Sequence, residues 1–185
     1  MCAWAKAQTP RWACETNMMD DLPHSASLRK GRWSEPGTGY LITQCRAPGL
    51  SLPLTDLMPA QAIVQSIRWH QEHQHAHLLA FVIMPDHVHW AFMLGKTRWL
   101  DQVMKGFASV TSREIIHSCA LRTPVVWQQE YHDRWLRSGE MTWATLDYIH
   151  LNPARNSLCV AAEDWPWSTA APRFRGWIEE DLLPV

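Results

Sequence analysis

Two histidines separated by a single residue, His87 and His89, follow a Pro-Asp pair in the stretch "MPDHVHW", which begins at Met84. If this stretch is a β-strand, side chains two residues apart point to the same side, so both imidazoles could bind one metal ion. Imidazole is a common ligand for divalent metals of borderline softness. The alternative is a pair of solvated histidines on the wet face of a half-buried sheet, and the spacing alone does not separate the two.

A denser histidine cluster comes shortly before this pair. The stretch "EHQHAHLL" contains His73, His75 and His77 at the same two-residue spacing. It spans the end of an expected helix and the loop after it, where a period of two has no fixed geometric meaning. We therefore expect these three side chains to be solvated surface, with metal binding as the lesser alternative.

Tyr148 and Asn152 are four residues apart in the stretch "GEMTWATLDYIHLN". On a helix this spacing places one side chain a turn above the other, so both project from the same part of the surface. Asparagine is a poor interior helix residue, and Asn152 directly precedes a proline. Taken alone, the pair is explained by an asparagine at a helix terminus with a half-buried tyrosine above it.

The elements that must position these side chains can be read from hydrophobic periodicity and turn signals. A Pro-Asp turn joins two strands into an antiparallel hairpin, and Ser138 can cap a final helix that should stop before Pro153. The order strand–helix–strand–strand–helix–strand–helix predicts an α+β, ferredoxin-like split βαβ fold, with an antiparallel sheet, helices on one face and a separate C-terminal helix. The expected strands are 40–45, 77–84, 87–94 and 124–129, and the expected helices are 60–73, 100–118 and 139–152.

Alternation along the strand 87–94 assigns its two faces. One face is wholly apolar and should pack against helices, whereas the two histidines lie together on the other face, close to the turn. In the last helix an apolar residue recurs every three positions, which predicts a buried stripe. The apolar strand face is Val88, Trp90, Phe92 and Leu94, the opposite face adds Ala91 and Met93, and the helix stripe is Trp143, Leu146 and Ile149.

Length and composition are those of one globular domain. The chain has 185 residues, of which 46% are hydrophobic and 12 are tryptophan. No apolar run is long enough for a membrane span, and the first residues lack the pattern of a secretory signal. Five scattered cysteines without a CxxC pair argue against a zinc ribbon or a disulfide framework, so we expect a reducing cytoplasm. Residues 1 to about 37 lack periodicity and are expected to form a poorly structured leader.

The net charge of −1 argues at first against a nucleic-acid partner. The charge is unevenly distributed, however, because the segment from Lys96 to Arg137 contains seven basic and four acidic residues. A basic middle segment can bind a phosphate backbone, although an ordinary solvated surface explains the same charges.

The ordered set of motifs resembles the HUH single-strand DNA transposases, specifically the REP-associated tyrosine transposases. The resemblance rests on "HVH" together with "DYIHLNPAR", and extends through "LRKGRWSEPGTGYLITQC", "LLAFVIMPDHVHW", "LDQVMKGFASVTSREI", "VWQQEYHDRWLRS" and "EDWPWSTA", in that order. It covers residues 28–170 as one transposase domain, with a leader at 1–27 and a tail at 171–185. The modest net charge is lower than expected for this family.

The resemblance implies metal-dependent cleavage and rejoining of single-stranded DNA. Carried onto the matching positions, it makes Tyr148 the nucleophile that forms a 5′-phosphotyrosine linkage. His87 and His89 become catalytic metal ligands, with Asn152 as the third ligand through its side-chain oxygen. The implied cofactor is Mg²⁺ or Mn²⁺, of which imidazole ligands favour Mn²⁺. A small hydrolase with a histidine metal site is a competing interpretation, but no well-placed carboxylate ligand is evident, since Asp86 lies in the turn.

The resemblance also implies the partner, a single-stranded DNA hairpin of the REP or BIME palindrome type. Candidate phosphate contacts are basic side chains of the second half, and Trp127 or Trp135 could stack on bases. We expect a monomer or a homodimer in a bacterial cytoplasm, associated with the nucleoid and not with a membrane. The alternative within the same fold is a domesticated hairpin-DNA binder or regulator with little or no cleavage. The candidate phosphate contacts are Lys105, Arg113, Arg134, Arg137 and Arg155.

Overall fold

The computed structural model describes residues 34–122, 125–137 and 139–178. The expected leader at 1–27, the proposed capping residue Ser138 and the end of the expected tail lie outside the described residues. The described residues belong to one compact unit of the chain. No helix in these ranges is long and apolar enough to cross a membrane.

The described residues form four strands and three α-helices in the order expected from the sequence. The elements, followed by two short 3₁₀ turns, are β1 (Gly39–Cys45), α1 (Leu57–Glu72), β2 (Ala76–Ile83), β3 (His87–Leu94), α2 (Leu100–Ser118), β4 (His132–Leu136), α3 (Gly139–Arg155), η2 (Ala162–Asp164) and η3 (Pro172–Phe174).

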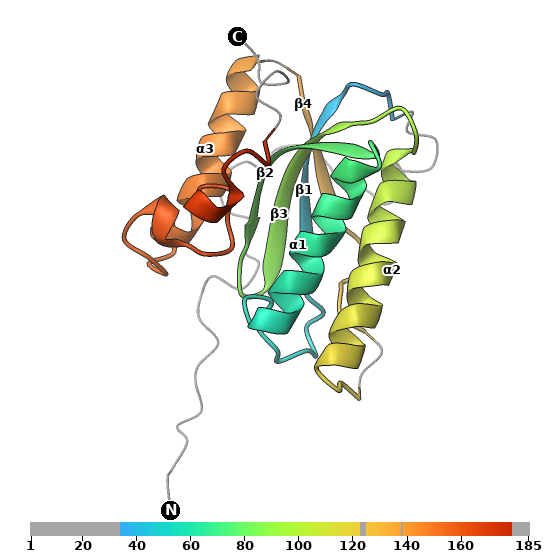
Figure 1. The fold of residues 1–185 in the computed structure, drawn as a ribbon, viewed down its shortest axis with the longest axis vertical. Helices are drawn as coiled ribbons and strands as arrows, with labels where there is room; N and C mark the ends of the chain where they lie inside the picture. Colours follow the sequence, from blue (N-terminus) through green and yellow to red (C-terminus); the bar gives the residue numbers. More distant parts are fainter. Residues whose placement is uncertain (1–33, 123–124, 138, 179–185) are drawn as a thin grey trace, which may run out of the picture. The chain divides into compact units, whose positions relative to one another are not determined.

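All neighbouring strands pair antiparallel, in the order β2-β3-β1-β4. β1 and β3 therefore occupy the centre of the sheet, and β2 and β4 are its flanking strands. Figure 1 shows α1 and α2 side by side across one face of the sheet, with α3 set apart from them. This arrangement confirms the predicted α+β fold and its ferredoxin-like strand order.

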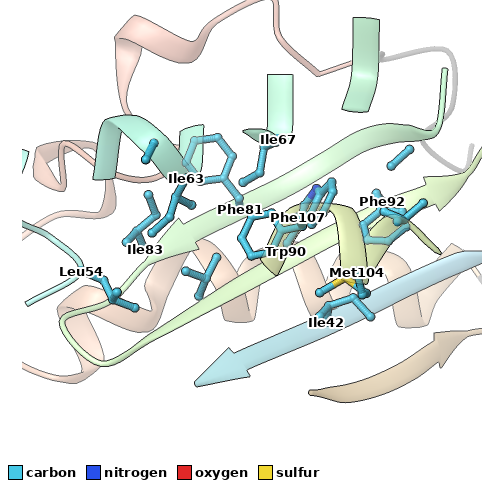
Figure 2. Close-up of a cluster of buried hydrophobic side chains, with 14 of the residues drawn as sticks. Ile42, Leu54, Ile63, Ile67, Phe81, Ile83, Trp90, Phe92, Met104 and Phe107 are labelled. Atoms are coloured by element: carbon cyan, nitrogen blue, oxygen red, sulfur yellow. The ribbon is translucent and has the colours of Figure 1, made fainter. Parts of the chain in front are cut away.

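The core between the sheet and the helices α1 and α2 follows the predicted alternation. Val88, Trp90 and Phe92 of β3 are each 1% exposed or less, and they belong to one buried cluster with the inner residues of both helices. Figure 2 shows Trp90 and Phe107 within this cluster. Burying side chains of this size contributes about 1.5–3 kcal/mol each, so this face anchors β3 firmly.

A second, smaller core lies on the other face of the sheet, under α3. Leu146 and Ile149 of α3 pack with sheet residues that include Val82, Ala91 and Leu136. The predicted stripe on this helix is wrong at Trp143, whose side chain is 45% exposed. Leu146 and Ile149 are buried as predicted, and among the described side chains of this helix the other buried ones are Thr142, Thr145, Asn152 and Pro153, so the buried face excludes Trp143.

The fourth strand predicted at 124–129 is also wrong over its described part, 125–129. Within this segment Trp127 forms only an isolated bridge with Arg46, and its indole N–H donates to Thr111 inside the core. Val126 and Trp127 therefore pack in the core without continuing a strand ladder. The strand is β4, whose polar sequence "HDRWL" gave a weaker signal because β4 is a flanking strand with mostly exposed side chains.

The last helix does not stop before Pro153 as predicted. It runs to Arg155, with Pro153 inside its final turn. At this position a proline loses only the bond to the carbonyl of Ile149, and the chain continues with the N–H of Asn156 donating to the carbonyl of Asn152. The extension keeps Asn152 in regular helical geometry one turn beyond Tyr148.

Candidate active site

The two histidines of β3 converge on one point. Their Nε2 atoms lie 3.2 Å apart, and the two rings meet edge to face with centroids 4.7 Å apart. Strand alternation places both rings on the same face, as expected from the sequence. The separation of the two nitrogens is small enough for one cation to contact both.

Each outer ring nitrogen has a partner that orients the ring. Nδ1 of His87 lies 2.7 Å from a carboxylate oxygen of Asp86. Nδ1 of His89 lies 2.9 Å from the hydroxyl of Thr43, which pairs with His89 in the β1–β3 ladder. Histidines that bind metals commonly hold their second nitrogen to a carboxylate or another polar group in this way.

The face that carries the histidines is not a wet surface. The side chain of His89 is only 5% exposed, because α3 covers this side of the sheet. Burial lowers the pKa of His89 well below its usual value, and the neighbouring His87 lowers it further. His89 is therefore neutral at physiological pH, which is the form of imidazole that binds metals.

The helix α3 brings Tyr148 to the histidine pair. The phenolic oxygen of Tyr148 lies 3.4 Å from Nε2 of His89, and the two rings are 5.3 Å apart. Burial raises the pKa of Tyr148, whereas a hydrogen bond with Asn152 and the positive charge of Arg155 act in the opposite direction. Tyr148 is still 40% exposed, so its hydroxyl remains accessible to a large substrate.

Asn152 lies one turn beyond Tyr148 on α3, as a buried polar side chain that is 6% exposed and hydrogen-bonded to Tyr148. Its Oδ1 atom accepts a hydrogen bond of 3.1 Å from the side-chain amide of Asn156, which also donates to the Asn152 carbonyl. An amide oxygen has two lone pairs, so this bond orients the side chain and leaves acceptor capacity.

Sequence reasoning missed three residues that orient this group: Thr43, Asp86 and Asn156. The i, i+4 spacing of Asn152 and Asn156 on one helix could have indicated the last of them. Asp86, which is not expected to bind a metal because it lies in the turn, contacts the outer nitrogen of His87. No sequence signal indicates Thr43, because its contact depends on the register between β1 and β3.

The donor set constrains what the site could hold. Among the described residues no group of three or more histidine, cysteine, aspartate or glutamate side chains could hold a metal ion. A metal at His87 and His89 would therefore need an oxygen of another kind, and the oriented amide of Asn152 is suited to that. Two neutral imidazoles and one amide oxygen are compatible with Mn²⁺ or Mg²⁺.

A comparison with models of protein families identifies the family of the chain. A family model described as "Transposase IS200 like" matches residues 55–151, which is more than half of the chain. The chain belongs to the IS200-like transposase family. The matched segment includes the histidine pair of β3 and Tyr148 of α3.

Individual relatives of this IS200-like transposase agree with the resemblance seen in the sequence. A curated protein of Haemophilus influenzae, named "Putative REP-associated tyrosine transposase", is 23% identical over 122 residues, which are 61% of this chain and 67% of that protein. A solved structure of a REP-associated tyrosine transposase bound to a REP hairpin matches with a TM-score of 0.61 and 20% identity, covering 75% of this chain and 79% of that chain. The predicted resemblance and fold are confirmed.

The basic residues proposed as phosphate contacts lie on both sides of the sheet of this IS200-like transposase. Arg134 of β4 stands opposite Leu41 in the ladder, and so shares the face of the histidine pair. His132 shares that face opposite Thr43 and was not identified from the sequence. Arg155 acts electrostatically on Tyr148.

The remaining candidates lie on α2 or directly after β4. Lys105 and Arg113 belong to α2, which packs on the opposite face of the sheet, and Lys105 forms an exposed ion pair with Asp101. Arg137 lies over the ring of Trp135, which is half exposed. Trp127, by contrast, is buried, so it cannot stack on a base without leaving the core.

The denser histidine cluster of this IS200-like transposase is only partly solvated, contrary to expectation. His73 is exposed, but His75 is 8% exposed and bonded at both ring nitrogens, to Thr97 and to Arg98. The rings of His73 and His75 pack against the side chain of Trp69, whereas His77 belongs to β2. The side chains of His73 and His75 therefore have a structural role at the end of α1.

Proposed function

We propose that this chain is a metal-dependent single-stranded DNA endonuclease and transposase that cleaves and rejoins DNA at REP-type hairpins. The single observation that carries the proposal is the position of the Tyr148 hydroxyl, 3.4 Å from Nε2 of His89. A potential nucleophile and a potential metal ligand from separate elements meet there. A binding module would not need this arrangement.

Tyr148 is the proposed nucleophile. Its phenolic O–H gives up its proton to solvent and the oxygen attacks the phosphorus of one phosphodiester. The bond from phosphorus to the 3′ oxygen breaks, and the leaving oxygen takes up a proton from solvent as a free 3′-hydroxyl. The 5′-phosphotyrosine ester keeps the energy of the broken bond, so rejoining needs no high-energy cofactor. Asn152 and Arg155 favour the phenolate, against the opposing effect of burial.

His87, His89 and Asn152 are the proposed ligands of a divalent ion, Mg²⁺ or Mn²⁺. When bound, such an ion would polarise a non-bridging phosphate oxygen and help to orient the scissile group. The two imidazoles fit this role because both Nε2 atoms face one point while Asp86 and Thr43 bind the outer nitrogens. Because Tyr148 and Asn152 share one helix, their separation is fixed, which favours a near-attack geometry.

The proposed substrate is a single-stranded DNA hairpin. Support comes from the similar solved protein, described as bound to a REP hairpin, with which this chain shares the fold. Arg134 shares the sheet face of the histidines, and the charge of Arg155 acts on Tyr148, so we propose both as phosphate contacts, which set the position of a nucleic acid. We propose a monomer or homodimer acting at the nucleoid of a bacterial cytoplasm.

The test is a search for a covalent protein–DNA adduct. The full chain is incubated with single-stranded REP-type hairpin oligonucleotides and Mn²⁺ or Mg²⁺, then separated under denaturing conditions. We expect a metal-dependent adduct with wild type and none with Tyr148→Phe. Tyr131→Phe is the matched control, because Tyr131 packs against the core on the α1–α2 side, and it should form the adduct normally.

Two outcomes would contradict the proposal. Tight hairpin binding without an adduct under either metal would favour the domesticated DNA-binding protein instead. An adduct that persists in Tyr148→Phe would place the nucleophile on another residue.

A further inference from the structure

The contact between the Nε2 atoms of His87 and His89 requires a positive centre between them. Two ring nitrogens 3.2 Å apart repel each other if both present lone pairs. A hydrogen on one of them, or a metal ion bound to both, turns the contact into an attraction. The same geometry therefore fits two forms of the pair, one with a hydrogen between the rings and one with a metal ion. The hydrogen-bond partners of the two Nδ1 atoms decide which ring can move its hydrogen from one nitrogen to the other.

His87 has a partner that permits only one arrangement of its neutral ring. An ionised carboxylate accepts hydrogen bonds and cannot donate them, so the contact with Asp86 keeps the hydrogen of His87 on Nδ1. A neutral His87 ring then presents a lone pair at Nε2 in both forms of the pair. The hydrogen between the two rings must accordingly belong to His89.

His89 has a partner of a different kind, the hydroxyl of Thr43 at 2.9 Å. A hydroxyl can donate or accept. When Nε2 of His89 carries the hydrogen, Nδ1 has a lone pair and Thr43 donates to it. When Nε2 is free to bind a metal, Nδ1 carries the hydrogen and Thr43 accepts.

We propose that Thr43 is a positioning residue that allows His89 to exchange between these two tautomers without losing its hydrogen bond. One N–H bond breaks at Nε2 and one forms at Nδ1, with water carrying the proton, so the ring stays neutral throughout. Only rotation of the Thr43 hydroxyl is needed, because Thr43 and His89 are directly paired in the β1–β3 ladder. The Tyr148 oxygen at 3.4 Å is a second, longer acceptor for the Nε2 hydrogen.

The chemistry of the side chain at position 43 is therefore specific. An aspartate there would hold His89 in the metal-binding tautomer, as Asp86 holds His87. A valine would leave a buried nitrogen of His89 without a partner in either form, which is unfavourable. A serine would preserve the two-way hydrogen bond.

The tautomers can be measured directly. The full chain with ¹⁵N-labelled histidine is studied by long-range ¹H–¹⁵N spectra at neutral pH, first in the presence of a chelator and then with Zn²⁺, a diamagnetic ion that binds imidazole. We expect the hydrogen of His89 on Nε2 with the chelator and on Nδ1 with Zn²⁺, and that of His87 on Nδ1 in both. One unchanged tautomer of His89, or a positively charged His87 ring with the chelator, would overturn the proposal.

A pair of variants supplies the second test. We expect Thr43→Val to bind Mn²⁺ about 10–100-fold more weakly than wild type, in the range seen when an outer partner of a metal-binding histidine is removed. Thr43→Ser should stay within roughly threefold of wild type, and Thr43→Ala serves if the valine variant does not fold. Equal Mn²⁺ affinities for the valine and serine variants would contradict the role of the hydroxyl.

The inference rests on the proposed function only through the metal-binding role of the pair. Its readouts are spectra and Mn²⁺ affinities, neither of which requires DNA. A chain that shows the tautomer exchange but forms no DNA adduct would retain this inference and lose the proposed function. A chain that forms the adduct with a single fixed His89 tautomer would retain the proposed function and lose this inference.

Discussion

The phenolic oxygen of Tyr148 lies 3.4 Å from Nε2 of His89, although the two residues are 59 positions apart in the chain. Nothing in either local sequence specifies this contact. It arises because α3 packs across the sheet face that carries the histidines, with Leu146 and Ile149 as its buried anchors. The position of the nucleophile therefore depends on how well that helix is held.

Removing one of these anchors should loosen the active site. We expect Leu146→Ala to lower the free energy of unfolding by about 2–4 kcal/mol, because it leaves a cavity under α3, and to reduce adduct formation as well. Trp143→Ala, on the same helix but 45% exposed, should cost less than about 1 kcal/mol. Urea unfolding followed by fluorescence checks both values. Equal losses would contradict the assignment of the buried face.

The two faces of the sheet should contribute unequally to DNA binding. We expect Arg134→Ala to weaken binding of a single-stranded hairpin and to reduce the slope of log K against log salt by about 1. Arg113→Ala removes the same charge from α2, on the far face, and should change both quantities much less. Titrations at several salt concentrations provide the measurement. Equal effects of the two substitutions would contradict this prediction, because they would mean that the DNA also contacts α2.

Arg155 should assist the nucleophile through its charge. Because its positive charge favours the phenolate of Tyr148, we expect Arg155→Ala to slow adduct formation roughly tenfold, equivalent to about 1.4 kcal/mol in the barrier. Arg155→Lys keeps the charge and should recover most of the rate. Single-turnover kinetics with saturating DNA separate this effect from weaker binding. A lysine variant as slow as the alanine variant would point to a hydrogen-bonding role.

The free energy of unfolding should fall in acid because of the buried side chain of His70. Burial lowers the pKa of His70 to about 4, and its Nδ1 atom has no hydrogen-bond partner among the described residues. Between pH 6.5 and about 4 the unfolded chain takes up a proton at this position and the folded chain does not. Stability from this residue is thus present above pH 6.5 and is lost as the pH falls to about 4, by up to about 3 kcal/mol.

A comparison of variants isolates this contribution from other titrating groups. We expect His70→Phe or His70→Gln to show a smaller loss of unfolding free energy between pH 6.5 and 4 than wild type. His73→Gln, which alters an exposed histidine of the same helix end, should retain the wild-type loss. Parallel slopes for wild type and both His70 variants would rule out His70 as the cause.

Local sequence determined most of the elements. The alternation in 87–94 and the turn at Pro85 predicted the hairpin and the shared face of His87 and His89, because strand geometry follows from nearest neighbours. The boundaries of α2 were predicted to the residue. Two of the failures, the strand at 124–129 and the helix end at Pro153, occurred where core packing or helix position outweighed local preference.

Only the tertiary structure decided the site. The sequence identified Tyr148 and the histidines as separate features, joined by resemblance to a family. The register of β1 against β3 brought Thr43 to His89, and the packing of α3 buried His89 and placed Tyr148 beside it. These contacts join residues far apart in the chain through side-chain packing, which a local pattern does not encode.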